Sequence, residues 1–189
     1  MSRTAVLFAG GKSSRMGRDK ALLPFGGHDS LAAYQHARLL TLFDQVYVVA
    51  KAPKFAFKCT LIEDHYEEAS PLVALVSVFE SLAEEEVFVL SVDAPFVDQV
   101  VIERLYHEAK EESDIIVARS PVGREPLCAI YRRTILPHAQ KHLAKGNHRL
   151  GFLLQSVNTQ EVYFDQEEAF MNLNHPHEYE EAYRLSSSI

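Results

Sequence analysis

The first strand-like segment of the chain leads directly into a glycine pair and a cluster of cations. The apolar run Ala5–Phe8 is typical of a buried strand, and Gly10 and Gly11 follow it. Backbone N–H groups of a glycine turn and fixed cations can together hold several phosphates. The whole chain has a net charge of -7, so the cations gathered here indicate a polyphosphate site at the end of a strand. The charged residues of the segment are Lys12, Arg15, Arg18, Asp19 and Lys20.

Two common phosphate-binding loops do not fit this segment. A Walker A loop needs a glycine five positions before its final glycine–lysine pair, and the corresponding residue here is Val6. The dinucleotide fingerprint G-x-G-x-x-G fails as well, because the glycines stand at positions 10, 11 and 17. The segment therefore represents a different kind of phosphate loop.

Strand-like and helix-like segments alternate through the remainder of the chain. This alternation predicts a three-layer α/β/α sandwich with a mainly parallel, Rossmann-like sheet in a single domain over residues 1–189. We expect strands at 4–8, 45–50, 60–62, 87–90, 114–118 and 126–131, short extended segments at 161–164 and 170–172, and helices at 30–42, 71–82, 98–110, 134–144, 148–155 and 178–185. Asp29 and Ser30 offer a cap for the first of these helices, and Ser70 and Pro71 open the second.

Composition narrows the class of protein. The acidic balance, with a pI near 5.7, argues against nucleic acid as a bulk partner. No apolar run reaches the ~20 residues of a membrane span, and the early first strand leaves no room for a signal peptide. Cys59 and Cys128 are far apart, so we expect reduced thiols in a cytoplasmic protein.

Acids and amides follow several predicted strands, where ligands bind in α/β sheets. Asp93 follows the strand at 87–90 and is placed to hold Mg²⁺ between phosphate oxygens, although a helix cap would also explain it. Asp64 follows the strand at 60–62, at the same end of the sheet, although an acid in an ordinary surface turn would also explain its position. Asn172 and Asn174 are two apart on an extended segment, so both amides could reach one ligand, while Asn174 could also cap the last helix.

The loop residues Ala9 to Leu23, Ala-Gly-Gly-Lys-Ser-Ser-Arg-Met-Gly-Arg-Asp-Lys-Ala-Leu-Leu, resemble the signature loop of the molybdenum cofactor guanylyltransferase (MobA) family of nucleotidyltransferases. The segments Asp93–Pro95 and Asn172–Pro176 resemble two further motifs of that family. The resemblance implies a fold of the nucleotide-diphospho-sugar transferase type. It also implies transfer of GMP from GTP to molybdenum-molybdopterin, with Mg²⁺ as cofactor and pyrophosphate as the second product.

The resemblance also implies a set of site residues. Arg15, Lys20 and Asp93 would be catalytic, with Asp93 holding the metal. The nucleotide-binding half would cover about residues 1–97 and the acceptor-binding half about 98–185. The nucleotide would contact Phe8, Ala9, Gly10, Gly11, Lys20, Asp64 and Asp93, and the acceptor would contact Arg124, Arg149, Asn172 and Asn174. Before the resemblance is considered, Arg124 and Arg149 fit ordinary surface arginines equally well.

The chain departs from the family pattern at three positions near the expected base pocket. Ser70 and Ala74 stand where the family usually has glycine, and Val49 stands where it often has asparagine. Glycine permits close approach of a base to the backbone, so these departures keep a related enzyme that uses CTP or another phosphorylated acceptor as an alternative. A GTP-binding cofactor carrier without catalysis is a third hypothesis. Molybdoenzymes or delivery proteins are partners that the resemblance alone implies.

Overall fold

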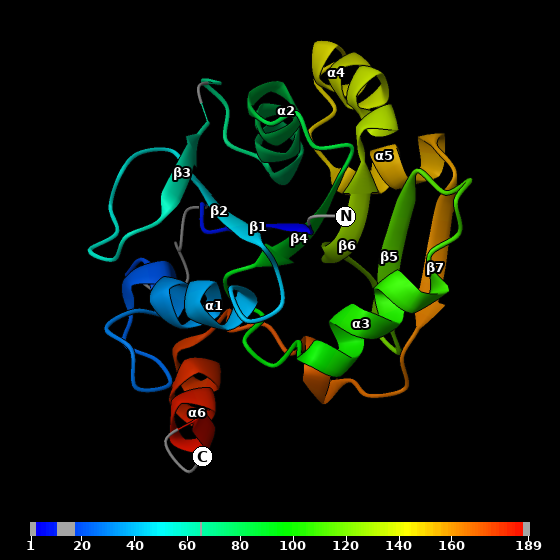
Figure 1. Cartoon of the computed structure of the whole chain (residues 1–189). Coiled ribbons are helices and arrows are strands. Elements are labelled where there is room, and N and C mark those ends of the chain that lie inside the picture. The colour runs from blue at the N-terminus through cyan, green and yellow to red at the C-terminus, as the bar shows by residue number, and fades with distance from the viewer. Residues whose placement is uncertain (1–2, 11–17, 65, 187–189) are drawn as a thin grey trace.

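The computed structural model describes residues 3–10, 18–64 and 66–186. They contain a seven-stranded sheet in the order β3-β2-β1-β4-β6-β5-β7 (Figure 1). Neighbouring strands run parallel except where β6 meets β4 and β5, so the predicted mainly parallel sheet is confirmed. The strands are β1 Thr4–Phe8, β2 Gln45–Ala50, β3 Thr60–Glu63, β4 Glu86–Ser91, β5 Ile115–Ser120, β6 Gly123–Arg132 and β7 Thr159–Tyr163.

Helices cover both faces of the sheet, which confirms the predicted three layers (Figure 1). One face carries α1 Leu31–Leu39, α3 Gln99–Glu108 and α6 Pro176–Ser186, and the other carries α2 Pro71–Ser81, α4 Leu136–Ala144 and α5 Leu150–Ser156. Short 3-10 turns are η1 Lys20–Leu22, η2 Arg133–Ile135 and η3 Glu168–Phe170. No helix in the described ranges is long and apolar enough to cross a membrane.

The central strands β1 and β4 are apolar over Ala5–Phe8 and Val87–Leu90 because these residues are buried on both faces of the sheet. All five residues of β1 are buried. Successive side chains point to opposite faces, so Leu7 packs with Leu31 of α1 while Val6 packs with Leu72 of α2. The two resulting cores fix the position of β1 and β4 in the middle of the sheet.

The helices α1, α2 and α3 begin within one residue of their predicted starts. The side-chain oxygens of Ser30, Ser70 and Asp98 each accept a hydrogen bond from a backbone N–H three residues on, at 3.1, 3.1 and 3.0 Å. The ends are less accurate, since α1 stops at Leu39 rather than near residue 42. A local turn follows Leu39, in which the N–H groups of Thr41 and Leu42 donate to the carbonyls of Arg38 and Leu39 at 3.2 and 3.0 Å.

Two predicted segments differ most from the structure. The segment expected to be extended at 170–172 is only partly so, because Phe170 ends η3, whereas Met171 is extended without strand pairing. The strand expected at 126–131 begins earlier, at Gly123, which has a φ of 147° and lets the chain turn tightly from β5 into β6. The pairing of Ser120 with Gly123 then extends β6 toward the turn.

This strand arrangement gathers the functional segments at one edge. The carboxyl ends of β1, β2, β3 and β4 lie together because these strands are parallel. Since β6 is antiparallel to β4, its amino-terminal residues lie at that same edge, just beyond the pairing of Leu90 with Cys128. The segments that follow β1, β2, β3 and β4 therefore meet the start of β6 at this edge of the sheet.

Candidate active site

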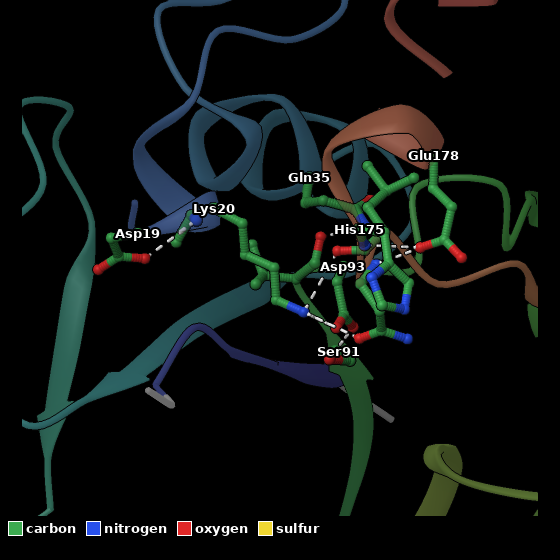
Figure 2. Close-up of polar contacts among 11 residues, drawn as sticks. Asp19, Lys20, Gln35, Ser91, Asp93, His175 and Glu178 are labelled. Carbon is green, nitrogen blue, oxygen red and sulfur yellow. Dashed lines mark hydrogen bonds and ion pairs between the residues drawn. The ribbon is translucent and has the colours of Figure 1, made fainter. Parts of the chain in front are cut away.

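Lys20 and Asp93 form the centre of the site. Lys20 is the first residue of η1, and its ammonium makes an ion pair with the Oδ2 atom of Asp93, beyond the end of β4. Figure 2 shows the lysine side chain reaching toward Asp93, with Asp19 on the far side of it. The pair brings the end of the predicted phosphate loop onto the predicted metal-binding acid.

The segment between η3 and α6, residues 171–175, contacts this pair. The N–H of Leu173 donates to the carbonyl of Asp93 at 2.8 Å. The ammonium of Lys20 donates to the carbonyl of Leu173 at 3.4 Å and to Oδ1 of Asn174 at 3.3 Å. Glu178 accepts from the N–H groups of Asn174 and His175 at 2.6 and 2.8 Å and so fixes the start of α6 (Figure 2). The predicted amide Asn174 therefore contacts a predicted catalytic cation.

Side chains beneath the site hold the Asp93 loop in place. The hydroxyl of Ser91 donates to Oδ1 of Asp93 at 2.5 Å. From α1, the fully buried Gln35 donates to the carbonyl of Val92 at 3.4 Å, and Arg38 donates to the carbonyl of Pro95 at 2.7 Å. Arg38 also donates to Oε1 of Gln35 at 2.6 Å. Both sides of the loop are thus tied to one helix, which leaves the Asp93 carboxylate in a fixed position.

The described ends of the phosphate loop are joined by Lys54. Its ammonium donates to the carbonyl of Ala9 at 2.9 Å and to Oδ2 of Asp19 at 2.5 Å. Asp19 also accepts from the N–H of Ala21 at 3.1 Å and so begins η1. A Cβ atom at Gly10 would meet described atoms only at 3.9 Å, so packing against them does not require glycine there. The predicted residues Gly11 and Arg15 lie outside the described part.

The remaining nucleotide residues lie along the same edge. Phe8 and Ala9 are buried at the end of β1, and the N–H of Ala9 donates to the carbonyl of Val49 at 3.0 Å. Asp64 follows β3 and is only 8% exposed. Its Oδ1 atom accepts from the N–H of Tyr66 at 3.1 Å, and its Oδ2 atom lies 3.9 Å from the ammonium of Lys51. Asp64 therefore has a turn role alongside any role toward nucleotide.

The start of α2, where the family pattern has glycines, is occupied by a polar contact. The hydroxyl of Ser70 caps the helix and lies 3.3 Å from Nδ1 of His148. The Nε2 atom of His148 is 2.7 Å from the carboxylate of Glu68. The contacts among Ser70, His148 and Glu68 place side chains near the expected base position, where a glycine would leave the backbone accessible.

A cavity of about 180 Å³ opens between the end of β4, the start of β6 and the last segment. Apolar side chains including Val97, Leu127 and Phe170 form part of its wall. The cavity contains both predicted amides, but none of the lysines or arginines in the described part of the chain lines it. Its polar lining residues are Ser91, Asp93, Glu125, Cys128, Asn172 and Asn174.

The two predicted acceptor arginines are not among the residues that line this cavity. Arg124 donates to Oε1 of Glu161 at 2.5 Å, and Arg119 donates to Oε2 of the same carboxylate at 2.5 Å. The hydrogen bond from Arg119 lowers the pKa of Glu161, and Arg124 adds to the effect. Arg149 is exposed and directly precedes α5. Their predicted contact with an acceptor phosphate stays a prediction.

Asp93 fits a magnesium ion that arrives with a nucleotide. Mg²⁺ is commonly held by one or two carboxylates together with substrate phosphates and water. Among the described residues, no three metal-ligating side chains gather, so a resident all-protein cage does not fit. A single half-buried carboxylate beside a cation suits the substrate-borne arrangement instead.

Sequence reasoning did not identify Gln35, Arg38, Lys54 and Glu125 as members of the site. Gln35 and Arg38 lie on a helix with no motif, so no sequence signal points to them. Glu125 directly follows Arg124, which was predicted to contact the acceptor. An acid just before the strand expected at 126–131 was the sequence signal that could have identified it.

Comparisons with known proteins agree with this geometry. The family model described as MobA-like NTP transferase domain matches residues 5–162. A relative from Campylobacter jejuni subsp. doylei named molybdenum cofactor guanylyltransferase is 37% identical over 177 residues, which cover 93% of this chain and 92% of the relative. A Helicobacter pylori relative of the same name is 34% identical and covers 95% and 91%.

A solved structure supports the fold. Molybdopterin-guanine dinucleotide biosynthesis protein A from Archaeoglobus fulgidus has a TM-score of 0.82 to this chain at 21% identity, covering 98% of this chain and 100% of that one. This likeness and the mixed sheet confirm the predicted fold of the nucleotide-diphospho-sugar transferase type.

Proposed function

The chain belongs to the MobA-like NTP transferase family, and from that premise we propose that it transfers GMP from GTP to molybdenum-loaded molybdopterin. The products are molybdopterin guanine dinucleotide and pyrophosphate. The observation that supports this proposal best is the Lys20–Asp93 ion pair, which joins the end of the predicted phosphate loop to an acid that lines the cavity beside β6.

The reaction joins two phosphates that are already ionised. A phosphate oxygen of the acceptor attacks the α-phosphorus of GTP, a new P–O bond forms, and the bond to the β-phosphate breaks to release pyrophosphate. No strong general base is needed, so alignment and neutralisation of charge supply the catalysis. Lys20 neutralises charge on the triphosphate and on the departing pyrophosphate, and Arg15 is assigned the same role.

Asp93 is assigned to hold Mg²⁺, which supplies further neutralisation of the phosphate oxygens when bound. Ser91 and the loop contacts from α1 keep the Asp93 carboxylate oriented before substrate binds. The ion pair with Lys20 keeps both charged groups partnered in the substrate-free site. When the nucleotide binds, Asp93 would hold the metal and Lys20 would neutralise the phosphate oxygens.

Substrates are divided between two sides of the Asp93 loop. The nucleotide is assigned to the side of β1, β2 and β3, with Phe8–Gly11 and Asp64, and the acceptor to the side of β6, with Asn172 and Asn174.

The protein is assigned to the cytoplasm, and a molybdoenzyme or a delivery protein receives the product.

The test is pyrophosphate release by the purified chain with Mg²⁺ and molybdenum-loaded molybdopterin, using GTP and CTP in parallel. Release with GTP that requires the acceptor is the expected result. Release with CTP alone would assign a sister activity, for which Ser70 at the start of α2 gives a structural reason. Tight GTP binding without release would indicate a carrier.

A further inference from the structure

Glu125 is a partly buried carboxyl group that the assigned reaction does not use. It lines the cavity from the β6 side, while Asp93 lines it from the β4 side. The hydroxyl of Ser120 donates to its Oε1 atom at 2.7 Å. In the described part of the chain no lysine or arginine forms an ion pair with it, in contrast to the neighbouring carboxylate of Glu161.

An irregularity in β6 places this carboxyl. Val117 of β5 pairs with Ala129, but the next residue, Ala118, pairs with Glu125, so residues 126–128 have no partner on β5, although Cys128 still pairs with Leu90 of β4. The buried hydroxyl of Tyr131 donates to the carbonyl of Pro126 at 2.7 Å and supports the bulge. Bulges redirect side chains beside active sites, and this one brings Glu125, Leu127 and Cys128 to the cavity wall.

The environment of Glu125 favours a ligand with N–H groups. Burial raises the pKa of the Glu125 carboxyl, and the hydrogen bond from Ser120 opposes the rise only in part. A partly buried carboxylate is stabilised by further donors, because an unpaired buried acceptor is costly. The cavity offers no lysine or arginine from the described residues, so it suits an uncharged part of the acceptor better than a phosphate.

The cavity's size and walls narrow the ligand further. Its volume of about 180 Å³ is below the ~300 Å³ of ordinary small-molecule pockets, so it suits one flat ring system rather than a whole cofactor. The apolar side chain of Phe170 can cover a ring face, and the amides of Asn172 and Asn174 can meet ring carbonyls and nitrogens. A carboxylate accepts two parallel hydrogen bonds from an amino group beside a ring N–H.

We propose that this cavity binds the 2-amino-4-oxo ring of the pterin acceptor and that Glu125 is its specificity-determining residue, accepting from the 2-amino group and the adjacent ring N–H. The inference rests on the proposed function for the identity of the acceptor. Ser120 is the positioning residue of Glu125, and the acceptor's phosphate extends out of the cavity toward Lys20.

Binding of phosphate-free ring compounds by the full chain tests the inference apart from catalysis. The probes are 6-hydroxymethylpterin and 6-hydroxymethyllumazine, which carries an oxo group where the pterin carries its 2-amino group. Fluorescence titration without nucleotide measures the dissociation constant of each. We expect the unmodified chain to prefer the pterin by about tenfold or more, the scale of a hydrogen bond to a charged group.

Variants of matched shape then test Glu125 itself. Glu125→Gln keeps the side-chain volume but replaces one acceptor by a donor, so the preference for pterin over lumazine should be lost. Glu112→Gln is the control, because Glu112 is exposed at the opposite edge of the sheet, and it should retain the preference. Ser120→Ala should lower the preference to an intermediate value. A thermal unfolding curve for each variant separates misfolding from loss of recognition.

Each outcome decides the inference. Loss of the preference in Glu125→Gln alone supports it. A preference that survives in Glu125→Gln, or an unmodified chain that does not distinguish or does not bind the two rings, overturns it. Pyrophosphate release measured with the same preparations decides the proposed function separately, since a Glu125-dependent ring preference without GTP-dependent release would reject only the transferase activity.

Discussion

The carboxylate of Asp93 holds the ammonium of Lys20, although the two residues are 73 positions apart in the sequence. The contact connects the segment after β1 with the segment after β4, and the carbonyl of Leu173 and the amide of Asn174 join it from the chain's last segment. Three parts of the chain that are distant in the sequence therefore meet at the ammonium of Lys20, beside the cavity.

Removing either member of this ion pair should reduce catalysis. Lys20→Ala and Asp93→Ala should each lower kcat for pyrophosphate release by about tenfold to a thousandfold, the range for lost electrostatic stabilisation. Lys58→Ala is a matched control, because Lys58 is exposed on the loop before β3. A kcat equal to that of the unmodified chain in either variant would remove the assigned role.

Arg38 should contribute to both stability and catalysis. Arg38→Met leaves the carbonyl of Pro95 and Oε1 of Gln35 without their donor, which should lower the free energy of unfolding in urea by about 1–3 kcal/mol. The loosened Asp93 loop should also lower kcat more than it raises the KM for GTP. Arg104→Met, at an exposed position of α3, should lose less stability and keep kcat. Unchanged kcat in Arg38→Met would make the residue structural only.

Ser70 should stabilise α2 through its cap. Ser70→Ala should lower the free energy of unfolding by about 1 kcal/mol, because the N–H of Val73 loses its acceptor, whereas Ser70→Gly should cost only a few tenths. Ser70→Gly should also ease access of a base to the backbone and lower the KM for GTP. Equal stability losses in the two variants would contradict the capping account, and an unchanged KM would show that Ser70 does not narrow the base pocket.

His36 should make stability depend on pH. Burial lowers the pKa of its imidazole below the ordinary 6.5, so the unfolded chain takes up the proton first as the pH falls. The stability contributed by the neutral ring is therefore complete above pH 6.5 and is lost as the pH falls below that value. Urea unfolding from about pH 7.5 to about pH 5.5 should show a smaller loss for His36→Gln than for the unmodified chain.

Exposed His107 provides the control for that series. His107→Gln should keep the pH dependence of the unmodified chain, since the side chain lies on the solvent side of α3. Parallel pH profiles for His36→Gln and the unmodified chain would contradict the assignment.

Much of the fold followed from local patterns. The bounds of β1 and β2 were predicted to the residue, since both are short apolar runs flanked by polar residues. The caps Ser30 and Ser70 marked helix starts correctly, because capping is a contact within one turn. The end of α1 and the segment near Phe170 were predicted less accurately, because a local turn follows Leu39 and the N–H of Leu173 binds the distant carbonyl of Asp93.

The site was predictable where a residue follows a strand. Asp93 and Lys20 come together because parallel strands end at one edge, a consequence of the predicted topology, and Asn174 joins them through the bond from the N–H of Leu173 to the carbonyl of Asp93. Lys54 and Glu125 were missed for a physical reason. Lys54 acts through a loop that folds back on Ala9, and Glu125 reaches the cavity only through an irregular strand pairing. Neither event leaves a periodic pattern in the sequence.

The central claim is tested most directly by measuring pyrophosphate release from GTP in the presence of Mg²⁺, with and without molybdenum-loaded molybdopterin, and with CTP in parallel. We predict release with GTP that depends on the acceptor, together with formation of the guanine dinucleotide. Absence of release with GTP, under conditions in which GTP binds tightly, would contradict the account.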